Sequence, residues 1–518
     1  MNNKSYYFEL SRNAQIIIFT VSLFTLLVHL YSNLFANYGI FRDEYYYFAC
    51  TNRLAAGYVD QPPLSIYLLA LSKLMFGNSL FAIRLFPAFA AAVTVNLTGL
   101  LTARMGGGTF AVLTACVTLA LSPIFLAMNT FFSMNSFDQF FWILSAYLVV
   151  RIVQENKSFD WILLGVTLGL GMLNKISMVW FGAGLTAGLL LTPHRTHLKT
   201  KWPYVAALIA FLIFSPYIIW NITHHFAHLE FIRNATRYKY NTVTPADFIG
   251  GQLLLPGPAA ILIWLPGLIY LLIGKAVKNY KILALIFLTT FIILIINWHS
   301  KPEYLAPAYP LILAGGGLFV EMIFKGRSYG WIKYVVVSII VLTGIAVIPL
   351  ALPVLPVQSF ISYSQFIGVG QQNSENKEMG NLPQFYADMF GWEDLAKDVS
   401  DVYTALPDTE KAGTVVFADN YGEAGALEYY ASRYNLPKVI CPHNSYWFWS
   451  DPDTQKIKTV IVLGGNIEDH KSTCRDITLA GIHKASHSMP YENNLPIYIC
   501  RDIYRSLKEI WRQARFYI

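Results

Sequence analysis

Segments of about 20 mostly apolar residues recur along the first 350 residues of this 518-residue chain. A helix needs about that length to cross the hydrocarbon core of a membrane, which is roughly 30 Å thick. Hydrophobic residues make up 55% of the chain and charged residues 13%, a balance that excludes an ordinary soluble protein. The approximate segments are 13–35, 81–104, 109–127, 135–154, 159–174, 176–192, 203–222, 257–274, 280–298, 303–324 and 332–350. We therefore predict a mainly α-helical, polytopic membrane bundle of about eleven transmembrane helices.

The stretch from Pro62 to Phe76 is apolar too, but it begins with two prolines and contains Lys73. These features favour an interfacial helix that lies on the membrane surface. The first predicted span is too long for a signal peptide and has no small-residue cleavage site after it. We expect this span to be retained as an anchor.

Basic residues lie in short clusters between the apolar segments. The net charge of +7 therefore indicates membrane topology, through the positive-inside rule, and no nucleic-acid partner is predicted. With the amino terminus in the cytoplasm, every inside segment carries at least one Lys or Arg. This orientation places the loops 36–80 and 223–256, and everything after about residue 351, on the outer face.

The composition changes after residue 350 to that of a soluble domain. Short β-branched runs at Thr414–Ala418 and Thr459–Leu463 predict buried strands, and Glu423–Tyr434 has helical spacing. We therefore predict a transmembrane domain at 1–350 and a small α/β extracytoplasmic domain at 351–518. This domain contains Cys441, Cys474 and Cys500, and the sequence leaves open whether two of them form a disulfide. Their spacing does not resemble a zinc site.

Two adjacent carboxylates, Asp43 and Glu44, follow the first span. Charge is costly where a helix leaves the bilayer, and neighbouring carboxylates repel each other. One member of such a pair needs a cationic partner or holds its proton more tightly, which is how a general base is poised near neutral pH. The alternative is a pair of solvated charges at a helix exit.

Asp138 is a lone acid among aromatic residues at the outer start of the span 135–154. An unpaired carboxylate is expensive at this position, so the side chain needs a partner or a function. The alternative is an acid that the helix macrodipole favours at an amino-terminal end.

Cations and hydroxyls occur in two other outward segments. The loop 223–256 carries Arg233, Arg237 and, as a further candidate, His225, but its histidines and arginines do not share one helical face and no metal site is predicted. Lys301 precedes a proline-rich helix entrance, where Tyr304 could donate its hydroxyl. Arg and Lys near a membrane suit the phosphate of a lipid head group. The alternatives are ordinary lipid-surface contacts and a snorkelling lysine.

These candidates all face outward in the predicted topology. Acids for base chemistry beside cations for phosphate indicate transfer from a phosphate-linked lipid. The glycine runs at 106–108 and 315–317 lack the Lys-Ser/Thr of a Walker loop, so we interpret them as a turn and a close-packing site. We expect Asp43 and Asp138 to meet in one cavity at the outer leaflet.

Four motifs then suggest a family: Asp43-Glu44-Tyr45-Tyr46-Tyr47, Gly57-Tyr58-Val59-Asp60-Gln61-Pro62-Pro63-Leu64, Arg84-Leu85-Phe86-Pro87 and Lys301-Pro302-Glu303-Tyr304. Over about residues 10–350 the chain resembles the bacterial branch of the protein O-mannosyltransferase superfamily, which are GT-C fold glycosyltransferases similar to the lipid A aminoarabinose transferase. The resemblance implies a polyprenyl-phosphate sugar donor and inverting transfer to an acceptor hydroxyl at the outer face of a prokaryotic plasma membrane. The acceptor would be a glycolipid, a polysaccharide or a protein. A divalent metal could assist, but this chemistry does not require one.

The resemblance also implies roles for residues. Asp43 would be the base, Glu44 its helper or a second ligand, and Asp138 the second acid that orients the acceptor or the base. Asp60 and Gln61 stand where the aminoarabinose transferase has a Glu-Lys pair. Because that lysine is missing, phosphate binding would depend on the other cations, which are Arg233, Arg237 and Lys301.

Two other classes of protein compete with this interpretation. A polytopic transporter or flippase for a lipid-linked or small substrate would also contain many spans and intramembrane charges. Transporters usually place charges near the bilayer midplane and often have two repeated halves, and neither feature is evident here. A receptor or scaffold with a functional outer domain is the second competitor.

Overall fold

The computed structural model describes residues 9–368, 377–450, 457–504 and 507–518. The chain divides into two compact units. We call them the helical unit, which contains residues up to Ala36, Phe76–Ile219 and Thr242–Pro356, and the α/β unit, which contains Asn37–Met75, Trp220–Asn241 and Val357–Ile518. The predicted division at residue 350 separates a transmembrane domain from an extracytoplasmic domain, and it stays a proposal.

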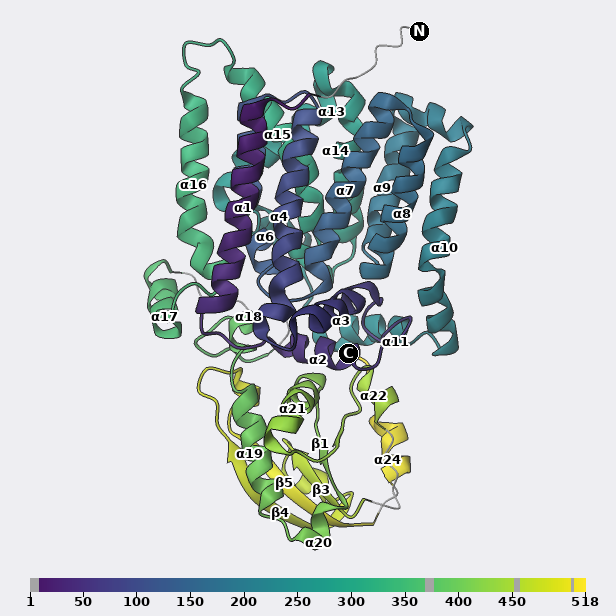
Figure 1. Ribbon diagram of the computed structural model, residues 1–518, viewed down its shortest axis with the longest axis vertical. Helices are drawn as coiled ribbons and strands as arrows, with labels where there is room; N and C mark the ends of the chain where they lie inside the picture. The colour runs from purple at the N-terminus through teal and green to yellow at the C-terminus, as the bar shows by residue number, and fades with distance from the viewer. Residues whose placement is uncertain (1–8, 369–376, 451–456, 505–506) are drawn as a thin grey trace. The chain divides into compact units, whose positions relative to one another are not determined.

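The helices of the helical unit follow the predicted apolar segments (Figure 1). Serine side chains cap three of them, because the hydroxyls of Ser11, Ser79 and Ser133 accept hydrogen bonds from first-turn N–H groups. The helices are α1 (Arg12–Phe35), α4 (Leu80–Arg104), α5 (Thr109–Ala120), α6 (Pro123–Met128), α7 (Met134–Glu155), α8 (Ser158–Asn174), α9 (Met178–Leu191), α10 (Trp202–Thr223), α12 (Pro245–Leu254), α13 (Ile261–Ile273), α14 (Lys281–Ile296), α15 (Tyr309–Phe324) and α16 (Ile332–Ala351).

Seven helices of the described chain are long and apolar enough to cross a membrane, or eight if α12 and α13, bent by 96°, form one span. The chain is thus a multi-pass membrane protein with a mainly helical fold, as predicted, but the count of about eleven spans is not confirmed. The predicted span 109–127 is interrupted because Pro123 cannot continue α5 and instead begins α6. The helices α8 and α9 are also short, at 17 and 14 residues.

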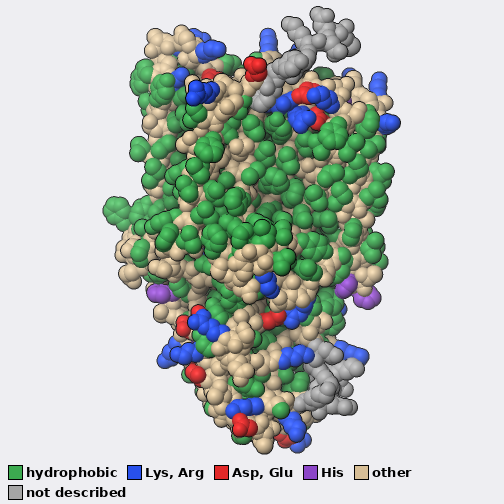
Figure 2. All heavy atoms as spheres, viewed as in Figure 1, with side chains coloured by type: hydrophobic (Ala, Val, Ile, Leu, Met, Phe, Trp, Pro, Cys, Tyr) green, Lys and Arg blue, Asp and Glu red, His purple; other side chains and the backbone are tan. Residues whose placement is uncertain are grey.

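The outward faces of the helical unit are apolar. Phe19, Leu27, Phe211 and Leu342 are each more than half exposed. On the face shown in Figure 2, hydrophobic side chains cover the helices of this unit, and its Lys, Arg, Asp and Glu side chains gather at the top of the view. A surface of this kind suits lipid, in which apolar side chains need no burial in protein.

Close packing in the helical unit depends on glycines in α15. A Cβ added at Gly316 would lie 2.3 Å from the Ile263 carbonyl oxygen of α13, and one at Gly317 would lie 2.3 Å from the Ala111 carbonyl oxygen of α5. Gly106, by contrast, has a φ of +98°, which suits a turn. Both interpretations of the glycine runs are therefore confirmed.

The α/β unit contains a five-stranded sheet with strand order β2-β1-β3-β5-β4. β1 pairs in parallel with β2 and β3, whereas β5 is antiparallel to β3 and β4. Helices α19 and α21 lie side by side in this unit (Figure 1), and Val460 and Val462 belong to a core cluster with Trp511 of α24. The elements are α2 (Arg42–Thr51), α3 (Leu64–Phe76), α11 (Ala227–Asn234), η2 (Ala235–Lys239), α17 (Val357–Phe366), α18 (Gln384–Ala387), α19 (Trp392–Thr404), α20 (Asp408–Lys411), β1 (Thr414–Phe417), α21 (Tyr421–Tyr434), β2 (Val439–Ile440), α22 (Tyr446–Trp449), β3 (Thr459–Leu463), α23 (Ile467–His470), β4 (Cys474–His483), β5 (Leu495–Ile503) and α24 (Leu507–Ala514).

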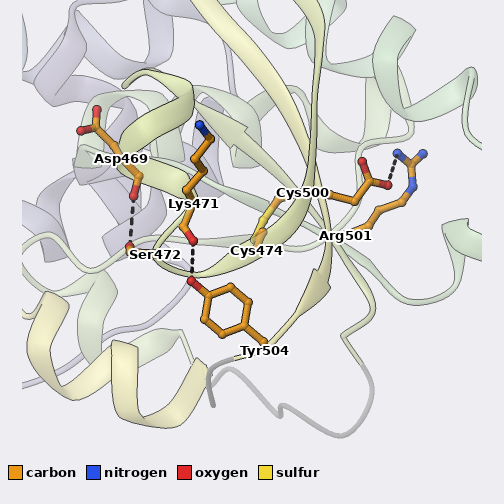
Figure 3. Close-up of a disulfide and its surroundings, with 8 residues drawn as sticks. Asp469, Lys471, Ser472, Cys474, Cys500, Arg501 and Tyr504 are labelled. Carbon is orange, nitrogen blue, oxygen red and sulfur yellow. Dashed lines mark hydrogen bonds and ion pairs between the residues drawn. A yellow bond between two sulfur atoms is a disulfide. The ribbon is translucent and has the colours of Figure 1, made fainter.

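A disulfide joins the neighbouring strands β4 and β5 (Figure 3). It links Cys474 to Cys500, whose Cα atoms are 5.8 Å apart, whereas Cys441 is a buried free thiol. Beside it, the Tyr504 hydroxyl donates to the Lys471 carbonyl. The disulfide that the sequence left open is therefore present, and both predicted strands and the predicted helix are confirmed.

We predict that Gly316→Ala destabilises the protein. The new Cβ would meet backbone atoms of α13, which cannot move without displacing that helix, so we expect the free energy of unfolding to fall by about 1–3 kcal/mol. Thermal unfolding in detergent would measure the effect. The matched control is Gly182→Ala in α9, where a Cβ would meet nothing within 4 Å. Equal melting temperatures for the two variants would contradict the prediction.

Candidate active site

The candidate site in the α/β unit begins at the first turn of α2. The Phe41 N–H donates to Glu44 Oε2 at 2.8 Å, and Glu44 is fully buried. This bond satisfies a backbone donor that the helix itself leaves unpaired. Glu44 thereby holds the start of α2.

Asp43 keeps about a quarter of its side chain exposed, at 27%. Its Oδ1 accepts a hydrogen bond from the Tyr421 hydroxyl at 2.8 Å and lies 3.4 Å from Arg42 Nε. The other oxygen, Oδ2, accepts no hydrogen bond from the described residues. Asp43 is therefore an oriented carboxylate with one oxygen available for another donor.

Arg42 connects α2 to the carboxy-terminal third of the chain. Its Nη1 donates to the Tyr491 hydroxyl at 2.8 Å and lies 3.6 Å from Asp388 Oδ2, and its Nη2 donates to the Tyr421 hydroxyl at 3.3 Å. The sequence did not indicate this role, because the three partners lie more than 300 residues further along the chain.

Asp60 is the second acid beside α2. The Tyr46 hydroxyl donates to its Oδ1 at 2.7 Å. Burial raises the pKa of Asp60 to about 6, although the hydrogen bond from Tyr46 opposes the shift. The negative charge of Asp43 adds to the increase in this pKa, and the positive charge of Lys239 opposes it. Burial and then the charges of Asp43 and Asp60 also raise the pKa of Tyr47. The charge of Asp43 therefore acts on both Asp60 and Tyr47.

Gln61 and the loop candidates take other positions. Gln61 is 1% exposed, and its Oε1 accepts from the Ser65 hydroxyl at 3.5 Å. His225, Arg233 and Arg237 are exposed, the first with a φ of +54°. In this loop, His228 instead donates through Nδ1 to the Val59 carbonyl at 2.9 Å, and Lys239 is the cation whose charge acts on Asp60.

The helical unit holds the other candidates around Lys175. Asp138 is fully buried, its Oδ2 accepts from the Ser177 hydroxyl at 2.8 Å, and Lys175 Nζ lies 3.7 Å from the same oxygen. Lys175 also lies over the Tyr304 ring, 5.4 Å from its centroid. Lys301 directly precedes the short helix that carries Tyr304. The predicted acid thus has a cationic partner that sequence reasoning did not select, since Lys175 follows a separate apolar segment.

Asp43 and Asp138 belong to different units, so their meeting in one cavity stays a prediction. Within the described residues, no three His, Cys, Asp or Glu side chains are grouped in a way that could hold a metal ion.

Two buried carboxylates accept hydrogen bonds from Asn420, the residue that precedes Tyr421. The Asn420 side-chain amide donates to Glu423 Oε1 at 2.9 Å and to Glu492 Oε1 at 3.2 Å. Burial raises the pKa of Glu492 to about 7, with Arg42 opposing the shift, and burial followed by the charge of Glu492 raises the pKa of Glu423 well above its ordinary value.

Comparison with known proteins agrees with this architecture. A family model described as dolichyl-phosphate-mannose-protein mannosyltransferase matches residues 60–220. The crystal structure of ArnT from Cupriavidus metallidurans bound to undecaprenyl phosphate is similar over 95% of this chain and 98% of that chain, with a TM-score of 0.61 and 10% identity. The arabinofuranosyltransferase AftD from Mycobacteria is similar over 96% of this chain and 40% of that chain, with a TM-score of 0.56 and 12% identity.

A protein of Aquifex aeolicus, described as uncharacterized, is 29% identical over 189 residues, which are 35% of this chain and 37% of that protein. The match thus spans well under two thirds of that relative.

The structural similarities show that the chain has the GT-C fold of the membrane glycosyltransferases and resembles ArnT. They confirm the predicted fold and family resemblance.

We predict that Glu492→Gln changes how stability depends on pH. The folded state keeps the Glu492 proton up to a pH of about 7, whereas the unfolded chain loses it near 4.5. Between these values the folded state binds more protons, so this group's contribution to stability falls as the pH rises. The variant should lose part of that slope when melting temperatures are measured from pH 4.5 to 7.5. Glu468→Gln, at an exposed position, is the control; parallel pH curves for wild type and Glu492→Gln would refute the assignment.

Proposed function

We propose that the protein is a membrane glycosyltransferase that moves a sugar from a polyprenyl-phosphate donor to an acceptor hydroxyl. The observation that carries this proposal is the similarity to ArnT over nearly the whole chain, since that ArnT structure contains undecaprenyl phosphate. The match of residues 60–220 to a mannosyltransferase family model supports the same class of reaction.

Asp43 is the proposed catalytic base. Its free Oδ2 takes the proton of the acceptor hydroxyl, whose oxygen forms the new bond to the anomeric carbon. The bond from that carbon to the phosphate oxygen breaks, and its electron pair leaves with the polyprenyl phosphate. Attack from the face opposite the phosphate inverts the anomeric centre. Positive charge is needed at the departing phosphate, because that oxygen gains negative charge in the transition state.

Lysines are the main candidates for that positive charge. Lys175 and Lys301, with the Tyr304 hydroxyl, are proposed phosphate ligands in the helical unit, and Lys239 is proposed beside Asp60. Arg233 and Arg237 are exposed and remain candidates for the lipid phosphate. Asp138 is proposed to orient the acceptor or the base, with Lys175 offsetting its charge.

The acceptor is proposed to be a glycolipid, a polysaccharide or a protein, and the sugar a hexose or a pentose. Lipopolysaccharide modification is one such process. The proposed location is the outer face of a prokaryotic inner membrane, with the domain at 351–518 on the extracytoplasmic side. The positive-inside distribution of Lys and Arg supports this orientation.

The proposal is tested with Asp43→Asn. Purified protein would be incubated with labelled polyprenyl-phosphate hexoses and pentoses and with extracted glycolipid, polysaccharide and protein acceptors. We expect transfer by the wild type and a loss of at least about 100-fold in the variant, because the amide cannot accept the proton. The control, Asp394→Asn, makes the same change at an exposed position on α19 and should keep wild-type activity. Equal transfer by wild type and Asp43→Asn would reject Asp43 as the base, and no transfer by the wild type would reject the proposed reaction.

A further inference from the structure

The Tyr421 hydroxyl lies between the two charged side chains that begin α2. It is 2.8 Å from Asp43 Oδ1 and 3.3 Å from Arg42 Nη2. A guanidinium can only donate hydrogen bonds, and a carboxylate can only accept them. The hydroxyl hydrogen must therefore point to Asp43, while the hydroxyl oxygen accepts from Arg42. One tyrosine thus fixes one oxygen of the proposed base.

The backbone that carries Tyr421 is itself held firmly. Asn420 caps α21, since its Oδ1 accepts from the N–H groups of Gly422 at 2.9 Å and Glu423 at 3.0 Å. Its amide reaches back to Glu423 and Glu492, which are both buried. The first residue of α21 therefore has little freedom to shift.

The Tyr421 ring is packed on several sides. It is 8% exposed, with ring centroids 5.1 Å from Tyr46 and 4.8 Å from His443. The Arg42 guanidinium carbon lies 5.5 Å from the centroid of the Tyr421 ring. These contacts restrict the ring, so the hydroxyl is presented to Asp43 in one orientation.

Glycines let α2 and α21 approach closely enough for this contact. A Cβ at Gly422 would lie 2.4 Å from Arg42 Cγ, and one at Gly425 would lie 2.8 Å from the backbone of Tyr45. The two helices therefore approach each other closely at these glycines, which leaves Tyr421 at the level of Asp43.

We infer that Tyr421 is a positioning residue for Asp43, so that α21 of the carboxy-terminal region completes the site of transfer. This inference rests on the proposed function, because it assigns Tyr421 to the same base. The hydroxyl holds Oδ1 and directs Oδ2 toward the acceptor. Without it, the carboxylate rotates about its side-chain bonds, and fewer of its conformers reach the acceptor proton.

The test compares Tyr421→Phe with wild type in the transfer assay, using the labelled polyprenyl-phosphate sugar that the wild type turns over. The substitution removes one oxygen and keeps the ring. We expect kcat to fall at least about tenfold while the donor KM stays within about twofold, because the base is misplaced and the donor contacts are unchanged. The melting temperature should stay within about 3 °C of the wild-type value.

Two matched variants separate the base from other effects. Tyr434→Phe removes a hydroxyl on the same helix that donates to Glu393 at 2.9 Å, and it should leave kcat unchanged. Tyr491→Phe removes a partner of Arg42 but none of Asp43, and it should have a smaller effect than Tyr421→Phe.

The outcomes distinguish the inference from the proposed function. If Asp43→Asn is inactive and Tyr421→Phe keeps a wild-type kcat, the inference fails and the proposed function stands. A Tyr421→Phe variant that loses its melting transition would also overturn the inference, since the hydroxyl would then serve folding rather than the base. If Asp43→Asn keeps full activity, the proposed base itself fails.

Discussion

Pairing the charge of Arg42, whose side chain is only 12% exposed, is the constraint on which the start of α2 depends. A buried guanidinium is costly unless acceptors surround it. This chain supplies them from Asp388, Tyr421 and Tyr491, which lie far along the sequence. Meeting that need fixes the first turn of α2, and the first turn carries Asp43. The orientation of the proposed base is thus a consequence of pairing its neighbour.

The same rule applies within the helical unit. Asp138 is fully buried and is matched by the Ser177 hydroxyl and by Lys175. The helices around it satisfy their own backbone groups through their internal hydrogen bonds. Glycines in α15 and α21 let helix backbones approach each other in both units. Close backbone packing at glycines and pairing of a charged side chain therefore occur in both units.

Sequence periodicity predicted much of the fold but less of the candidate site. Apolar length located the helices, although Pro123 divided one predicted span, and the β-branched runs located β1 and β3. Asp43 and Asp138 could be selected because a charge beside a membrane span is costly unless it has a partner or a function. The sequence could not distinguish the role of Glu44 from that of Asp43, because only the structure shows that Glu44 accepts a hydrogen bond from the Phe41 N–H. Lys175 and Tyr421 were missed because their relevance depends on neighbours that are distant in sequence.

By itself the sequence determined that the chain is a polytopic, mainly helical membrane protein, because the need to bury apolar length and to satisfy backbone groups in lipid acts locally along the chain. Its motifs also determined the resemblance to GT-C glycosyltransferases. Only the tertiary structure decided which oxygen of Asp43 is engaged, which cations lie near the acids, and that Cys474 pairs with Cys500. These facts depend on distances of a few ångströms between segments that hundreds of residues can separate, and no local pattern encodes such distances.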